Sequence, residues 1–226
     1  MVMAAVVAAV VLVGFSPSFY LRSTFNPGKG LSILLHVHGF VLSAWIVLFL
    51  VQTILIVRGS PTLHRRLGWV MSGLAACIVV LMSAAIVEQL RRVPPEPPPP
   101  VALALGAFDI VVFTTLVSMA IYFRRRPDWH KRLMLSATIL LLGAPMVRIV
   151  VLFGVRDISK IMLLWPIMTD LLFVACFAYD FATRRKVHPA YFVGLGLVML
   201  DQIGQPTVLS WPAWTNFANA LQRLVA

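Results

Sequence analysis

Seven long apolar runs are the feature that most limits how this chain can fold. Each is close to the roughly 20 residues that a helix needs to cross the hydrocarbon of a bilayer. They lie near residues 1–21, 31–57, 67–90, 101–123, 133–155, 161–182 and 190–209. Because backbone groups in lipid must satisfy one another, the runs predict an all-α, polytopic transmembrane helix bundle, formed as a single domain over residues 1–226.

Composition and charge agree with a membrane location. Apolar residues make up 60% of the chain and charged residues 12%, which leaves too little polar surface for a water-soluble protein of 226 residues. The formal charge of +11 comes from Lys and Arg in short loops between the apolar runs. We therefore expect the lipid bilayer as a partner, and no nucleic acid. Residues 211–226, with Trp211 and Trp214, predict an interfacial amphipathic helix.

The distribution of basic residues predicts the orientation. The loops after the second, fourth and sixth runs carry 11 Lys and Arg, whereas the loops after the first, third and fifth carry 6. The positive-inside rule then places the N-terminus in the cytoplasm and the C-terminus outside, in a bacterial inner (plasma) membrane.

Ionisable residues inside the runs are the first candidate site. Counted at 1.5 Å per residue, five such side chains from five runs lie about 10 to 14 Å from the outer end of the bundle. These are His38, Asp109, Arg148, Asp170 and Asp201. Because buried charges usually face the bundle interior, they predict one polar pocket in the outer half of the bilayer, with Glu88 above it.

The second apolar run adds two more polar residues to this pocket. His38, Trp45 and Gln52 recur every seven residues and share one helical stripe, whereas His36 points elsewhere. Two interpretations stay open. The residues form a site that binds or relays something, or they form a structural ion network around Arg148.

A second constellation lies at the cytoplasmic rim. "LHRRLGWVMSGLA" and "WHKRLMLSATILL" begin two runs with His-basic-Arg-Leu, 66 residues apart. A duplicated helical hairpin explains this echo, and so does chance combined with the need for positive charge. Interfacial anchoring predicts anion or lipid-headgroup binding by Arg65, Arg66, Lys131 and Arg132. In the functional alternative, His64 and His130 are ligands of one cofactor, such as haem. His36 and His38 are further candidate cofactor or metal ligands.

The runs "LHVHGFVLSAWIVLFLVQTILIVRGSPTLHRRLGWV" and "RRRPDWHKRLMLSATILLLGAPMVRI" carry a resemblance over roughly residues 15–153. This part of the chain resembles uncharacterised bacterial multi-pass membrane proteins with HRRLG and HKRLM helix starts. More distantly it is similar to small b-type cytochromes and to a membrane factor for cytochrome oxidase assembly. The resemblance implies a haem, metal or respiratory-chain context. The chain departs from it on the outer side, where only the second run supplies histidine.

These observations favour a binding or assembly component over an enzyme, since the chain carries no GxSxG, HExxH, P-loop or GxGxxG motif. We expect it to bind haem, a metal or a quinone-like ligand, with haem b as the leading cofactor candidate and His38 as ligand or proton acceptor. A respiratory membrane complex and a second copy of the chain are the candidate partners. The alternatives are a proton-coupled transporter or channel for a small solute, and a non-catalytic membrane scaffold.

Overall fold

The structure is a computed structural model that describes residues 1–25, 30–91 and 98–225. These residues form ten α-helices, one π-helical segment and one short 3-10 helix, and no strand, which confirms the predicted all-α class. The elements are α1 (Val2–Phe15), η1 (Ser16–Tyr20), α2 (Arg22–Phe25), α3 (Ile33–Val57), α4 (Pro61–Leu90), α5 (Pro99–Tyr122), η2 (Phe123–Arg125), α6 (Pro127–Leu140), α7 (Gly143–Leu152), α8 (Ile158–Arg184), α9 (Pro189–Leu209) and α10 (Pro212–Val225).

The described helices include six that are long and apolar enough to cross a membrane, counting α1 and η1 as one. A seventh span arises if α6 and α7, which are bent by 44° relative to each other, cross together. The chain is therefore an integral multi-pass membrane protein.

The bend between α6 and α7 has a local cause. Pro145, the third residue of α7, has no N–H to donate, and its ring would clash with the carbonyl of Leu141 in a continuous helix. The chain instead makes a tight turn, in which Leu142 N–H donates to the Ile139 carbonyl at 2.9 Å.

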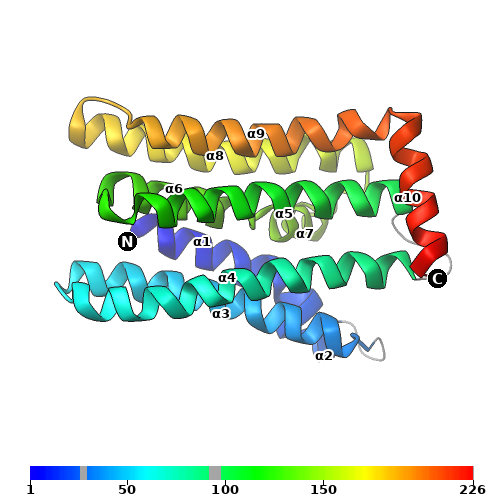
Figure 1. The fold of residues 1–226 in the computed structure, drawn as a ribbon, viewed down its shortest axis with the longest axis horizontal. Helices are drawn as coiled ribbons and strands as arrows, with labels where there is room; N and C mark the ends of the chain where they lie inside the picture. The colour runs from blue at the N-terminus through cyan, green and yellow to red at the C-terminus, as the bar shows by residue number, and fades with distance from the viewer. Residues whose placement is uncertain (26–29, 92–97, 226) are drawn as a thin grey trace.

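The long helices run side by side along the longest axis, and α10 crosses one end of the bundle (Figure 1). The N-terminus lies at the opposite end, together with the α3–α4, α5–α6 and α8–α9 connections. We call this the basic end, because it carries the Arg- and Lys-rich loops. Helix α10 is fixed by Trp214, whose indole N–H donates to the Pro100 carbonyl at 3.0 Å, and by Arg91, which donates to the Val225 carbonyl at 2.9 Å.

The core is centred on α5 and α6. Trp45, Phe113, Leu133 and Phe173 are fully buried there. Trp45 meets the Phe113 ring edge-on at 5.3 Å, and its indole N–H donates to Thr138 Oγ1 at 3.3 Å. Because a buried indole needs an acceptor, this bond fixes α3 against α6.

Candidate functional site

The repeated histidine motif occupies the same register on two helices. Helix α4 begins at Pro61 and α6 at Pro127, and the histidine is the fourth residue in both. Proline suits a first helical position because its φ is already helical and it lacks an N–H that would have no partner there. Both helices start at the basic end (Figure 1), so His64 and His130 enter the bundle at one level.

The two imidazoles face a common space. Their ring centroids lie 6.2 Å apart with the ring planes at 86°. His130 Nδ1 lies 2.9 Å from the Ala120 carbonyl oxygen. Because a carbonyl only accepts, Nδ1 carries the proton, which leaves the lone pair of the other ring nitrogen, Nε2, free. This arrangement is typical of histidines that bind a metal through the second nitrogen.

His64 presents a free nitrogen in a different way. Its Nδ1 is buried and has no hydrogen-bond partner within the described chain. The same imidazole interacts with the backbone of Gln52 on α3. His64 is therefore held by α3, and one ring nitrogen remains for a ligand.

A cavity of about 240 Å³ adjoins the two histidines. Its walls come from α3, α4, α5 and α6 and are mainly apolar, with a few polar groups. The lining residues include Gln52, His64, Met71, His130, Lys131 and Met134. Gln52 is 6% exposed, and its Oε1 accepts no hydrogen bond from the described chain. Buried polar atoms without partners are rare, so Gln52 and His64 mark this cavity as a candidate ligand site.

Comparisons with known proteins were made for the whole chain. No protein-family model, curated protein or solved structure matches it.

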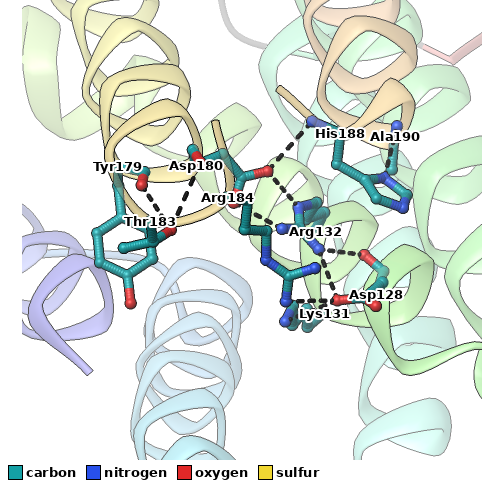
Figure 2. Close-up of polar contacts among 9 residues, drawn as sticks. All are labelled: Asp128, Lys131, Arg132, Tyr179, Asp180, Thr183, Arg184, His188 and Ala190. Carbon is teal, nitrogen blue, oxygen red and sulfur yellow. Dashed lines mark hydrogen bonds and ion pairs between the residues drawn. The ribbon is translucent and has the colours of Figure 1, made fainter. Parts of the chain in front are cut away.

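A network of ion pairs fixes the start of α6 beside the cavity (Figure 2). Arg132 donates from Nε to Asp180 Oδ2 at 2.9 Å and from Nη2 to Asp180 Oδ1 at 2.6 Å. It also donates to Asp128 Oδ1 at 3.1 Å, and Lys131 and Arg184 contact the same oxygen at 3.0 and 2.9 Å. Three cations and two carboxylates of α6 and α8 are thereby paired next to His130.

This network changes the interpretation of the predicted headgroup-binding residues. Arg132 is only 2% exposed, so the anions it binds are carboxylates of this chain. Lys131 is half exposed and paired with Asp128, whereas Arg65 and Arg66 are exposed. The sequence analysis did not identify Asp128 or Asp180. The i, i+4 spacing of Asp128 and Arg132 is a signal for the first, but nothing local indicates Asp180, 48 residues away.

The polar groups predicted for the outer half form separate contacts. The carboxyl groups of Asp109 on α5 and Asp201 on α9 interact directly. Asp201 is 1% exposed, and no backbone N–H and no alcohol or cationic side chain of the described chain donates to either of its oxygens. Asp170 on α8 instead accepts from Gln202 Nε2 at 3.2 Å.

The remaining predicted residues are spread over other helices. Arg148 donates to Ser18 Oγ at 3.2 Å and lies over the Phe15 ring at 4.6 Å. His38 lies close enough for the charge of Arg148 to act on it, and its buried Nδ1 has no partner in the described chain. Glu88 accepts from Ser32 Oγ at 2.8 Å, and exposed His36 contacts the Ser32 carbonyl at 3.0 Å.

Of the predicted outer-pocket residues, Trp45 and Gln52 line the cavity, and they lie there with His64 rather than with His38. The structure therefore brings together the two rim histidines and the inner part of the α3 stripe. The sequence analysis also missed Met71 and Met134 as cavity residues, because methionine in an apolar helix normally indicates core packing.

Proposed function

We propose that this membrane protein binds a metal centre, as a bare ion or within a cofactor, between His64 and His130. The observation that carries the proposal is the 6.2 Å separation of the ring centroids. When one metal ion binds two imidazoles through metal–nitrogen bonds of about 2 Å and lies nearly in line between them, the ring centroids are separated by about this distance. The Ala120 carbonyl, which fixes the tautomer of His130, is the outer partner that such a ligand requires.

The size of the cavity supports an ion over a whole haem. Pockets that bury drug-sized ligands measure about 300–1,000 Å³. The cavity of about 240 Å³ is smaller, and a haem macrocycle is a large, flat group. A bare ion is therefore the preferred form of the metal centre, and haem b, the leading candidate from the sequence, is the less favoured form.

Purified full-length protein tests the proposal directly. Metal analysis and the visible spectrum are measured before and after incubation with metal salts or haem. We expect stoichiometric metal, or a Soret band, that is lost in His64→Ala and in His130→Ala. His36→Ala is the matched control, because His36 is exposed and does not line the cavity. Failure of every metal and of haem to bind, or loss in the control alone, would contradict the proposal.

A quinone-like ring is the second candidate ligand. The buried Gln52 Oε1, which has no partner in the described chain, favours it. A quinol hydroxyl would donate to the unpartnered Oε1, and a neighbouring histidine would exchange its proton. Extraction of the native protein and analysis of bound lipids for quinones separates this candidate from the metal. Quinone that co-purifies with wild type and is lost in Gln52→Leu would favour the ring.

We infer a bacterial inner-membrane location with the N-terminus in the cytoplasm, supported by the basic residues at one end of the bundle. The histidine cavity would then lie in the cytoplasmic half of the membrane. A non-enzymatic binding or assembly role in a respiratory complex remains part of the proposal. Reporter fusions at the C-terminus test the orientation, and a cytoplasmic C-terminus would reverse it.

A further inference from the structure

Two thioether side chains join the histidines around the cavity. Met134 lies four residues after His130, which places both on one face of α6 at neighbouring turns. Met71 lies seven residues after His64 on α4, two turns along the same face. Met71 is 4% exposed and Met134 is half-buried. Thioether sulfur is therefore available near the imidazoles. Met134 lies about one turn from His130, whereas Met71 lies about two turns from His64.

The kinds of ligand around the cavity select among metals. The described lining residues include no carboxylate and no thiol. Among the described residues, no group of three or more His, Cys, Asp or Glu is placed to hold a metal. Mg²⁺ and Ca²⁺ need oxygen ligands, and structural Zn²⁺ sites normally use four His, Cys or carboxylate ligands. Imidazole with thioether is instead the soft, neutral combination that favours Cu(I).

Charge points the same way. A single positive charge costs less to desolvate in an apolar cavity than a double charge, and the ligands here are neutral. Lys131 also lines the cavity, but its ammonium lies 3.0 Å from Asp128 Oδ1, which offsets part of its charge. The cavity is therefore better suited to a monovalent than to a divalent cation.

We propose that the cavity binds Cu(I), with the imidazoles of His64 and His130 and the thioether of Met134 as its ligands. This inference rests on the proposed metal function and names its metal. Met71 lies one turn too far along α4 to share the first coordination shell, so it serves as the matched control.

The test is an anaerobic titration of full-length protein in detergent with Cu(I), in competition with a chromophoric Cu(I) chelator. We expect one equivalent to bind, and Met134→Leu to weaken the affinity by at least about tenfold. Met71→Leu should change the affinity less than about threefold. Both substitutions preserve side-chain volume, so the fold should persist, and thermal unfolding of each variant checks this. X-ray absorption of the copper-loaded protein should show sulfur scattering that Met134→Leu removes.

The outcomes separate this inference from the proposed function. Histidine-dependent binding of Zn²⁺ or haem without binding of Cu(I) would overturn the copper assignment and leave the metal function standing. No binding of any metal or haem would overturn both. Copper binding without sulfur scattering, and unaffected by Met134→Leu, would overturn the coordination by Met134.

Discussion

Arg132 and Asp180 form a doubly hydrogen-bonded ion pair between α6 and α8, with both side chains 2% exposed. The parallel N–H···O bonds of 2.9 and 2.6 Å are the bidentate geometry that guanidinium and carboxylate groups favour. Asp180 also accepts from the His188 backbone N–H at 3.2 Å, so one carboxylate links α6, α8 and the start of α9 (Figure 2). The pair fixes the helix that carries His130.

Removing Asp180 should therefore be strongly destabilising. In Asp180→Ala, the buried Arg132 keeps its charge without its main partner, which costs about 3–5 kcal/mol. The measurement is the free energy of unfolding in detergent, with Arg185→Ala, an exposed neighbour, as control. The double variant Arg132→Met with Asp180→Leu should recover most of the loss, because both charges are then absent. The prediction would be contradicted if Arg185→Ala lowered the free energy of unfolding as much as Asp180→Ala does. It would also be contradicted if Asp180→Ala lowered that free energy by less than about 1 kcal/mol.

The Asp109–Asp201 pair predicts a different response to mutation. A carboxylate oxygen only accepts hydrogen bonds, so a bond between the two carboxyl groups needs a proton on one of them. Asp201→Asn supplies an N–H donor in the same shape and should change the free energy of unfolding by less than about 1 kcal/mol. Asp201→Ala leaves Asp109 without this partner and should cost about 1–3 kcal/mol. Thermal unfolding near neutral pH compares the variants, and equal losses in both would argue against a shared proton.

His188 gives the protein a testable pH dependence. Its Nδ1 accepts from the Ala190 N–H at 3.1 Å and so caps α9, which requires that nitrogen to be unprotonated. Burial first, and then the charge of Arg132, lower the pKa of His188 below its ordinary value of 6.5, while Asp128 and Asp180 act in the opposite direction. The unfolded chain therefore takes up the proton first. The stability from His188 is complete above pH 6.5 and decreases as the pH falls below it.

His188→Asn isolates this effect, because asparagine caps a helix without titrating in this range. Melting temperatures of both proteins are compared between about pH 7.5 and pH 5.5. We expect wild type to lose more stability than the variant over this interval. Identical slopes would show that His188 does not contribute.

Sequence reasoning predicted the helical membrane fold well, because the apolar runs are long and proline and basic residues mark their ends. It also placed His64 and His130 at equivalent helix starts. That they meet was only one of two alternatives, the one in which both bind a single cofactor, since the distance between two helices depends on packing that neither helix encodes alone. The pairing of Arg132 with Asp180 was unpredictable for the same reason. The expected convergence of His38, Asp109, Arg148, Asp170 and Asp201 relied on depth alone, and depth does not specify which way a side chain points.

Close packing of α9 on α6 should make Gly194 intolerant of a side chain. A Cβ added to Gly194 would collide with Ser136 Oγ and lie 3.5 Å from Phe173 Cε1, whereas a Cβ on Gly196 meets nothing within 4 Å. Gly194→Ala should therefore cost about 1–3 kcal/mol through overpacking. Gly196→Ala should be neutral or stabilising by up to about 1 kcal/mol, since alanine is the better helix former.

A second substitution, at Ser136, tests whether the destabilisation by Gly194→Ala comes from a collision with the Ser136 side chain. Its hydroxyl donates to the Arg132 carbonyl at 2.9 Å, so the side chain is held where the new methyl group would go. Adding Ser136→Gly to Gly194→Ala removes the colliding atoms and should restore part of the stability. The recovery is reduced by about 1 kcal/mol, because glycine inside a helix is itself destabilising. Unfolding free energies of the single and double variants measure this coupling. Strict additivity would mean that α6 and α9 do not approach as closely here as the structure has them.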